Sequence, residues 1–459
     1  MLKLYRNSLK KIEECQFDSS QDVKIYTCGP TVYDYPHIGN WYTFIRYDLI
    51  VRLLRGSGFN VIWVMNITDV GHLVSDSDSG EDKMQKGAQR EGKTAWELAE
   101  FYTDYFKRFI DELNFSEISY LPKATDYIKE QIQLIEALEQ KGFTYKIEDG
   151  IYFDTSKFSK YADFAKLNLD GQDEGARVEV NTDKINPSDF ALWKFSPLDQ
   201  KRDMEWDSPW GKGFPGWHLE CSAMIHALLG EPIDIHAGGI DHIPIHHTNE
   251  VAQSEAAYDK TLSRHWMHCN HILVDGQKMS KSLGNFIKLD DIINKNIPLL
   301  VFRAHVLSGH YRSQSEFSWA GLESTNSRLQ GWVDKLSELK QILQNNFSYD
   351  LDVYKNEIVE ALNNDLNSPL ALSAIDNQIN NLNSEDVPEY LNIINSLTGI
   401  QLSPFLNELN DDEQNILEKR ANAKTNQDWE QSDKIRDELL SRAIKIKDTK
   451  DGQIWSRVI

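Results

Sequence analysis

The alternation of apolar and polar residues near the N-terminus predicts a strand, a helix and a second strand. Val23–Thr27 is a short apolar run typical of a buried strand, and 41–54 places aromatic and aliphatic residues on one helical face before Gly56-Ser57-Gly58 ends it. The run 60–67 is apolar enough for the middle of a parallel sheet. In such a βαβ unit ligands bind beyond the carboxyl ends of the strands, so chemistry is expected in 28–40.

The rest of the chain changes pattern several times. The predicted elements are, in order, a helix from a capping box at Thr94-Ala95-Trp96-Glu97 to Leu113, a helix over 125–141, short strands and turns over 145–207, a resumed α/β pattern over 217–285, amphipathic helices over 289–397 and a small polar unit after Pro404. Strand signals almost vanish after Leu289. The strand-rich segment is interpreted as an insertion into the α/β domain.

Composition and charge narrow the class of protein. The 459 residues include 49 basic and 71 acidic ones, a net charge of −22, which argues against a protein that coats nucleic acid by bulk electrostatics. No apolar run reaches the roughly 18 residues of a membrane span, and the N-terminus lacks the pattern of a signal peptide. We therefore expect no membrane association and a cytoplasmic location. In reducing cytosol Cys15, Cys28, Cys221 and Cys269 are expected to be thiols or metal ligands.

Two motifs suit phosphate chemistry. His37 and Asn40 stand at the start of a helix, where free N–H groups favour an anion, and Gly39 lets a nucleotide approach the backbone. Lys278 and Lys281 lie three apart in a loop of small residues, as point charges appropriate to pyrophosphate. Taken singly, His37 is equally well a polar cap and the lysine loop a solvated turn.

A candidate metal site is spread along the sequence. Cys28 follows the first strand, Cys221 lies in a glycine-flanked apolar segment, and His246 and Glu250 share one helical face at i, i+4. Two thiolates, an imidazole and a carboxylate suit zinc. Small core cysteines are the alternative, and the spacing alone leaves both interpretations open.

These motifs carry a family resemblance. His37-Ile38-Gly39-Asn40 with Lys278-Met279-Ser280-Lys281-Ser282 resembles the signature pair of class I aminoacyl-tRNA synthetases. The segments 28–34, 216–224, 236–241 and 246–250 resemble the cysteinyl-tRNA synthetase family in order and spacing. Near the C-terminus, the residues that resemble that family's anticodon-binding domain are Arg420, Asp433, 435–437, Asp448, Thr449 and 452–455.

The resemblance implies a fold and its division. It predicts an α/β, Rossmann-type class I synthetase catalytic domain with an inserted connective domain, followed by an α-helical bundle and a small anticodon-binding domain. The implied boundaries are 1–114 and 213–290 for the two catalytic halves, 115–212 for the insertion, 291–403 for the helical stem-contact and bundle region, and 404–459 for the anticodon-binding domain.

The resemblance also implies an activity and its residues. The expected reaction is ATP-dependent ligation of L-cysteine to tRNA(Cys) through cysteinyl-adenylate, in a monomer, with one Zn²⁺ per chain and ATP acting with Mg²⁺. The residues implied for catalysis are His37, Asn40, Lys278 and Lys281, and these four also bind ATP and the adenylate, together with Gly29, Thr31, Gly39 and Asp241. The residues implied for the substrate pocket are Thr68, Trp217 and His236. The implied zinc ligands are Cys28, Cys221, His246 and Glu250. Cys15 and Cys269 lie outside this set and are expected to be structural.

Two other functions remain open at this stage. One is a sister ligase that joins cysteine to an amino sugar, which shares the zinc site but lacks a full anticodon domain. The other is a non-catalytic RNA-binding relative. The C-terminal helices argue against the first, and intact His37, Lys278 and Lys281 argue against the second.

Overall fold

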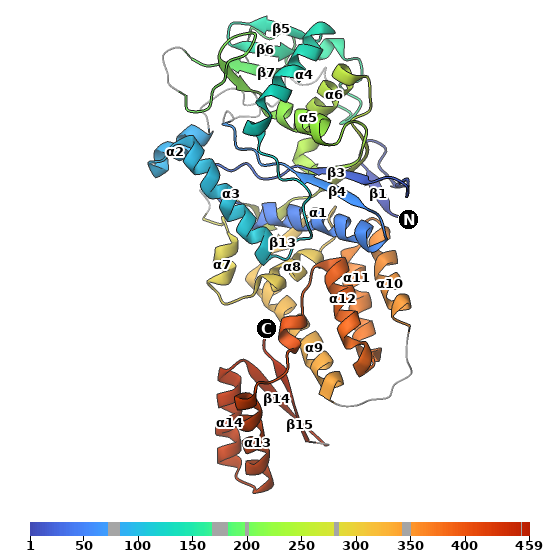
Figure 1. Ribbon diagram of the computed structural model, residues 1–459, viewed down its shortest axis with the longest axis vertical. Coiled ribbons are helices and arrows are strands. Elements are labelled where there is room, and N and C mark those ends of the chain that lie inside the picture. Colours follow the sequence, from blue (N-terminus) through green and yellow to red (C-terminus); the bar gives the residue numbers. More distant parts are fainter. Residues whose placement is uncertain (72–82, 168–181, 198–201, 280–283, 342–349, 451) are drawn as a thin grey trace. The chain divides into compact units, whose positions relative to one another are not determined.

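The computed structural model describes residues 1–71, 83–167, 182–197, 202–279, 284–341, 350–450 and 452–459 (Figure 1). They form two compact units. The first comprises residues 1–271 and 311–314, and the second comprises 272–310 and 315–459.

A four-stranded parallel sheet forms the centre of the first unit, in the order β10-β9-β3-β4. Its strands are β3 (Val23–Thr27), β4 (Val61–Met65), β9 (Ile233–Gly239) and β10 (Ser263–Cys269), and a hairpin of β1 (Lys3–Arg6) and β2 (Lys11–Glu14) has β1 lying beside β10. The predicted first strand is confirmed residue for residue, and the second is confirmed within its predicted range.

The helices α1 (Ile38–Gly56) and α5 (Trp217–Leu228) lie on opposite faces of this sheet (Figure 1). Tyr26 and Val64 are buried in one core cluster with Met224 of α5. Because side chains alternate along a strand, the neighbouring Thr27 and Trp63 face the other way, where the Trp63 indole N–H donates to Thr27 Oγ1 at 3.1 Å. Both faces are therefore buried, which explains the nearly continuous apolar strands.

Further helices and a second sheet complete the unit. The elements are α2 (Lys83–Glu91), α3 (Ala95–Glu112), a 3₁₀ turn at Ala124–Tyr127, α4 (Ile128–Gln140), a 3₁₀ turn at Thr155–Lys157, 3₁₀ and π turns at Ile240–His242 and Ile243–His247, and α6 (Thr248–Tyr258). A second, antiparallel sheet is formed by β5 (Thr144–Ile147), β6 (Gly150–Phe153), β7 (Phe190–Phe195) and β8 (Gly213–Pro215), the last of which follows the predicted insertion 115–212. The predicted capping box is confirmed, since Thr94 Oγ1 accepts from the Glu97 N–H and the Thr94 N–H donates to Glu97 Oε2.

The second unit is mainly helical. Its elements are β11 (Ile272–Val274), β12 (Gln277–Lys278), α7 (Leu289–Ile293), α8 (Leu299–Leu307), β13 (Ser315–Phe317), α9 (Trp319–Gln341), α10 (Leu351–Asn363), α11 (Ser368–Gln378), 3₁₀ turns at Ile379–Asn381 and Ser384–Asp386, α12 (Val387–Thr398), a 3₁₀ turn at Ser403–Leu406, α13 (Asp411–Thr425), α14 (Trp429–Ser441), β14 (Ile444–Thr449) and β15 (Gly452–Arg457). β13 pairs with β11, and β14 pairs with β15. The expectation of almost no strands after Leu289 therefore missed a strand and a hairpin.

The C-terminal elements have a small core of their own. Leu409, Ile416, Ile435, Leu439 and Ile444 are buried together between α13, α14 and β14. The hairpin also lies against α9, whose Gln341 side chain exchanges two hydrogen bonds with the Trp455 backbone. None of the described helices is long and apolar enough to cross a membrane.

Candidate functional site

Four buried donor groups converge beyond the carboxyl end of β3. Cys28 directly follows that strand, Cys221 lies in α5, His246 in the π turn and Glu250 in the first turn of α6. All four are buried, and their ligand atoms lie within 4.8 Å of one another. The structure thus brings together the four residues proposed as metal ligands, from segments that span more than 200 positions of the sequence.

Glu250 divides its two oxygens between two histidines. Oε1 lies 2.6 Å from His246 Nε2, and Oε2 lies 2.7 Å from His236 Nε2. Burial opposes a charge on Glu250, but the two imidazoles outweigh it and hold its pKa below the ordinary range. Burial likewise disfavours a charged His246, yet the Glu250 carboxylate and the Cys221 sulfur raise its pKa to about 10. The carboxylate is therefore ionised at neutral pH.

The two thiols have opposite acidities. Burial raises the pKa of Cys28 well above its usual value, and the Cys221 sulfur adds to the effect. A hydrogen bond from Cys28 lowers the pKa of Cys221 to about 7, against burial, with further help from His246. Cys221 is thus the first of the pair to become a thiolate.

This donor set fits zinc. Zinc prefers thiolate and imidazole ligands and accepts a carboxylate, and the described residues offer two sulfurs, one ring nitrogen and one carboxylate around a common point. Hard cations such as Mg²⁺ and Ca²⁺ prefer all-oxygen sites, which this is not.

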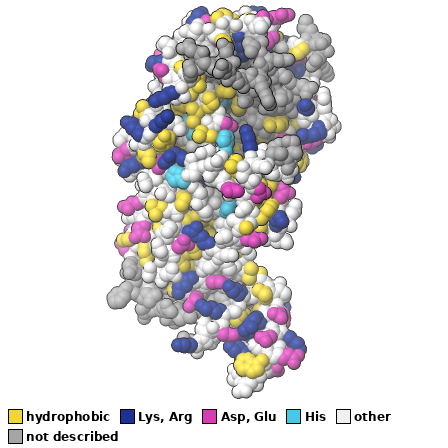
Figure 2. Space-filling view, turned by 180° about the vertical axis from the view of Figure 1, so that it is seen from behind, with side chains coloured by type: hydrophobic (Ala, Val, Ile, Leu, Met, Phe, Trp, Pro, Cys, Tyr) yellow, Lys and Arg dark blue, Asp and Glu magenta, His cyan; other side chains and the backbone are white. Residues whose placement is uncertain are grey.

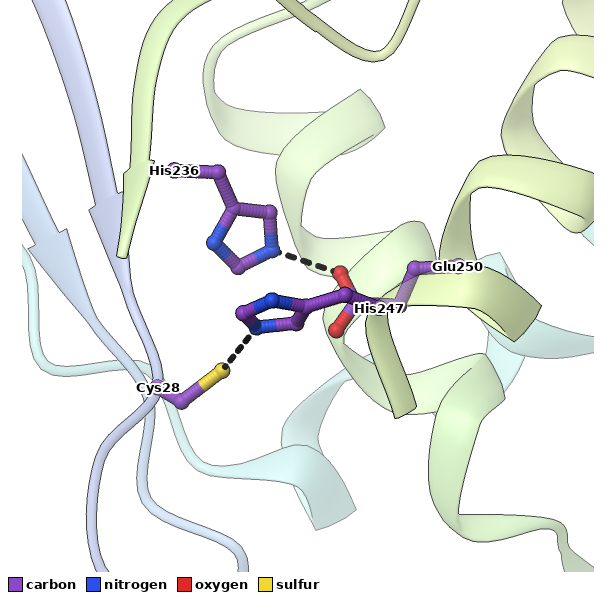
Figure 3. Close-up of side chains that lie close together, drawn as sticks. All are labelled: Cys28, His236, His247 and Glu250. Atoms are coloured by element: carbon purple, nitrogen blue, oxygen red, sulfur yellow. Dashed lines mark hydrogen bonds and ion pairs between the residues drawn. The ribbon is translucent and has the colours of Figure 1, made fainter. Parts of the chain in front are cut away.

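A second donor set overlaps the first. It consists of Cys28, His236, His247 and Glu250, whose ligand atoms also lie within 4.8 Å of one another (Figure 3). His247 Nε2 lies 3.4 Å from Cys28 Sγ, and burial lowers the pKa of His247 well below its usual value. Sequence reasoning missed His247, although its position directly after His246 was a signal.

More histidines surround these groups. His268 Nε2 lies 2.9 Å from His247 Nδ1, and His218 Nδ1 lies 2.9 Å from His246 Nδ1. Burial lowers the pKa of His268 to about 3, so this ring is neutral. The Trp266 indole stacks on His236, with ring centroids 4.8 Å apart. These contacts fix the rings behind the candidate ligands.

Gly238 makes room for two of the rings at the end of β9. A Cβ atom there would lie 2.5 Å from His247 Cε1 and 2.7 Å from His242 Nδ1. Any side chain at this position would therefore displace both rings. Sequence analysis placed 236–241 in the family resemblance without a reason for this glycine, and the close approach supplies one.

Two of the three residues predicted for the substrate pocket, Trp217 and His236, contact the donor cluster. Trp217 is half-buried and stacks on His246, with centroids 4.6 Å apart. Thr68 Oγ1 donates to Glu220 Oε2 at 3.2 Å and accepts from Asn66 Nδ2 at 2.9 Å. His236 is part of the cluster itself, through its contact with Glu250.

The candidate ATP residues lie in the loop after β3 and at the start of α1. Asn40 Oδ1 accepts from the His37 N–H at 3.0 Å, so the asparagine side chain caps the helix from within. Thr31 forms a bridge with Thr68. Gly29 has a packing reason as well, because a Cβ there would lie 1.7 Å from the Asn66 carbonyl oxygen.

The remaining predicted residues belong to separate elements. Gly39 lies in the first turn of α1, and Asp241 is exposed in the turn after β9. Lys278 is exposed in β12, where its carbonyl accepts from Asn285 Nδ2. Lys281 lies outside the described residues.

Many basic side chains of the C-terminal elements are engaged in ion pairs. Arg420, Lys424 and Arg436 pair with Asp448, Arg442 with Asp412 and Glu438, Lys445 with Asp334, Lys447 with Glu338, and Arg457 with Glu413. Arg420 is fully buried, and its pairing lowers the pKa of Asp448. Figure 2 accordingly shows basic and acidic side chains interspersed over this lower part of the molecule.

Comparison with known proteins gives matches over nearly the whole chain. Residues 14–327 match the family described as tRNA synthetases class I (C) catalytic domain, and residues 406–455 match the cysteinyl-tRNA ligase anticodon binding domain. The cysteine–tRNA ligase of Treponema denticola is 42% identical, with all of both chains covered. Cysteine–tRNA ligase 1 of Burkholderia lata is also 42% identical, over 94% of this chain and 92% of its own.

Solved structures show the same fold at low sequence identity. A methionyl-tRNA synthetase of Mycobacterium tuberculosis, in complex with methionyl-adenylate, matches with a TM-score of 0.61 and 14% identity. The match covers 83% of this chain and 92% of that one. It supports the fold alone, an α/β class I synthetase catalytic domain followed by helices.

Proposed function

The chain belongs to the cysteinyl-tRNA synthetase family, and we propose that it ligates L-cysteine to tRNA(Cys) with ATP, through a cysteinyl-adenylate. The observation that carries the proposal is the buried set of Cys28, Cys221, His246 and Glu250 within this fold. The cysteine carboxylate attacks the α-phosphate of ATP and pyrophosphate leaves. A ribose hydroxyl of the terminal adenosine of tRNA then attacks the carbonyl carbon of the adenylate, and AMP leaves.

The donor cluster is proposed to hold one zinc ion that selects cysteine. When bound, zinc stabilises a thiolate and takes it as a ligand, whereas the hydroxyl of serine is a poor match. An apolar pocket distinguishes near-isosteres such as cysteine and serine by only about 1–3 kcal/mol. Direct binding of the sulfur to the metal therefore discriminates more strongly between the two amino acids. His236 and His246 hold Glu250 ionised, which keeps the cluster anionic enough for a divalent cation.

Catalysis is proposed to depend on positioning and charge. His37 and Asn40 would steady the phosphates at the start of α1, where the helix N-terminus favours anions. Lys278 and Lys281 would neutralise the departing pyrophosphate together with Mg²⁺. The half-buried position of His37 and the exposure of Lys278 are compatible with these roles.

The adenylate is proposed to lie along the carboxyl ends of β3, β4 and β9. Gly29, Thr31, Gly39 and Asp241 would border the nucleotide, while Thr68, Trp217 and His236 would border the cysteinyl part. The stacking of Trp217 on His246 supports this arrangement, because it places an aromatic wall directly beside the candidate zinc ligands.

The C-terminal elements, residues 404–459, are proposed to form the domain that reads the anticodon. The proposed catalytic domain consists of two halves, 1–114 and 213–290, with the connective insertion 115–212 between them. Residues 291–403 are proposed as the stem-contact and bundle region. We also propose a monomer in the cytoplasm. The match of 406–455 to an anticodon binding domain favours tRNA over an amino sugar as the cysteine acceptor.

Two assays on one preparation test the proposal. Cysteine-dependent ATP–pyrophosphate exchange reports the adenylate step, and charging of tRNA(Cys) with radiolabelled cysteine reports the transfer. We expect both. Exchange without charging, together with consumption of an amino sugar, would favour the sister ligase, and absence of both would favour the non-catalytic relative.

A further inference from the structure

A chain of hydrogen bonds begins at Asn7 and ends at Cys28. Asn7 Nδ2 lies 2.9 Å from His268 Nδ1, His268 Nε2 lies 2.9 Å from His247 Nδ1, and His247 Nε2 lies 3.4 Å from Cys28 Sγ. Figure 3 shows the last of these contacts. Both rings are buried.

The first member of the chain fixes the direction of all the others. The Asn7 amide is placed with its nitrogen toward the ring, and an amide nitrogen is only a donor, so His268 Nδ1 accepts and the single proton of this neutral ring sits on Nε2. His268 Nε2–H then donates to His247 Nδ1, which leaves the proton of His247 on its own Nε2. That N–H points at the sulfur of Cys28.

This direction matters because the two donor sets compete. Both sets contain Cys28 and Glu250. The first set is completed by Cys221 and His246, and the second by His236 and His247. A ring nitrogen that carries a proton has no lone pair for a metal. Zinc can displace one of the two protons of the charged His246 ring, which leaves a neutral ligand. The neutral His247 ring has only the proton on Nε2, so it cannot ligate there without a change of tautomer in both rings and instead donates to the Cys28 sulfur.

We propose that Asn7 is a positioning residue that, through His268 and His247, closes the second donor set and directs zinc to the Cys221 and His246 side. The inference rests on the proposed zinc site. The placement of Asn7 supports it: the residue lies in the turn between β1 and β2, and β1 lies beside β10, which carries His268. An asparagine in a turn ordinarily serves its own backbone, whereas this one bonds a histidine 261 positions away.

Nitrogen NMR of the zinc-loaded full-length protein, labelled with ¹⁵N-histidine, tests the direction itself. We expect both His247 and His268 as neutral rings protonated on Nε2. Protonation of His247 on Nδ1 would overturn the proposal, because a lone pair would then face Cys28. Wild-type protein without bound zinc would instead refute the proposed function, so the two failures are distinguishable.

Asn7→Asp reverses the first hydrogen bond with almost no change of shape, because a carboxylate accepts where the amide donates. We expect both rings to switch to the Nδ1–H form and zinc affinity, measured in competition with a chelator, to fall about tenfold. Ser8→Asp, which puts the same charge on a side chain that contacts Arg6, is the matched control. Unchanged ring spectra and affinity in Asn7→Asp would show that residue 7 does not set the direction.

Discussion

The two carboxylate oxygens of Glu250 contact different histidines. One oxygen contacts His246 and the other contacts His236, and all three groups are buried. Removing one partner of a buried ion pair leaves an uncompensated charge and costs about 3–5 kcal/mol, so this carboxylate depends on both rings. One oxygen therefore contacts a proposed zinc ligand, His246, and the other contacts His236, which lies outside that set.

Replacement of Cys221 tests the ligand set at this scale. Cys221→Ser exchanges the more acidic thiol for a hydroxyl that zinc binds poorly, and His247 cannot complete the alternative set while its Nε2 carries a proton. We therefore expect well below one equivalent of zinc in protein purified without added metal, measured by elemental analysis. Cys15→Ala, a buried cysteine in the β2 region, should retain a full equivalent. A full equivalent in Cys221→Ser would refute the assignment.

Replacement of Lys281 tests whether its positive charge assists the departure of pyrophosphate. Lys281→Ala should slow cysteine-dependent pyrophosphate exchange by about 10²–10³-fold, because the lysine meets charge that appears only as pyrophosphate leaves. Cysteine affinity, measured by calorimetry, should change little. The exposed Lys260 at the end of α6 provides the control in Lys260→Ala. Normal exchange combined with weak cysteine binding would contradict the role.

Among the elements, those with a strong local signal were predictable. β3, α1 and α3 follow from apolar periodicity and, for α3, from the reciprocal capping of Thr94 and Glu97. The β14–β15 hairpin was missed because charged residues alternate with its buried ones, so the segment was interpreted only as part of a small polar unit. The partners of Lys445 and Lys447, which are Asp334 and Glu338 on α9, are more than 100 positions away, and no local pattern reveals such pairing.

The same distance effect limited prediction of the site. Cys28, Cys221, His246 and Glu250 became a set only through family resemblance, since their spacing alone left core cysteines open. His247 was within reach, next to a predicted ligand. Asn7 and His268 were not, because their contact depends on how the β1–β2 turn lies against the end of β10.

The ion-pair cluster around Asp448 gives the C-terminal elements a pH-dependent stability. The pKa of Asp448 in the folded chain lies below its unfolded value of about 3.9, so its contribution is present above about pH 5 and is lost as the pH falls through the folded pKa. Asp448→Asn should destabilise α13 and α14 at pH 7 by about 1–2 kcal/mol, less than for a fully buried pair because Asp448 is one-third exposed.

Hydrogen exchange with mass spectrometry, read on peptides from α13 and α14, measures this effect. The difference between Asp448→Asn and the wild type should shrink as the pH is lowered from 5 to 3. Asp433→Asn, which alters a more exposed carboxylate of the same helix pair, should have a smaller effect at pH 7. A difference that is the same at every pH would mean that the charge of Asp448 is not what stabilises these helices.

Across the whole molecule, acidity and RNA binding must be reconciled. The net charge of −22 argues against strong non-specific attraction to a phosphate backbone, and many of the C-terminal basic side chains are already paired internally. Binding of tRNA would then exchange internal pairs for phosphate contacts or use shape and base stacking. Either route gives modest affinity and favours selective recognition over bulk attraction.

Removal of the residues after Pro404 tests whether the two chemical steps are separable. The proposed zinc ligands and adenylate residues of the first unit lie outside this segment. Deletion would also uncover a surface of α9 that includes four polar residues, which in the full-length chain form hydrogen bonds with the hairpin region: Gln330, Asp334, Glu338 and Gln341. The truncated protein should therefore stay folded by circular dichroism and retain most of its pyrophosphate exchange. Its charging of tRNA(Cys) should fall steeply, with most of the loss in the KM for tRNA. Equal loss of both activities in a folded protein would show that the C-terminal elements support the adenylate step instead of reading the anticodon.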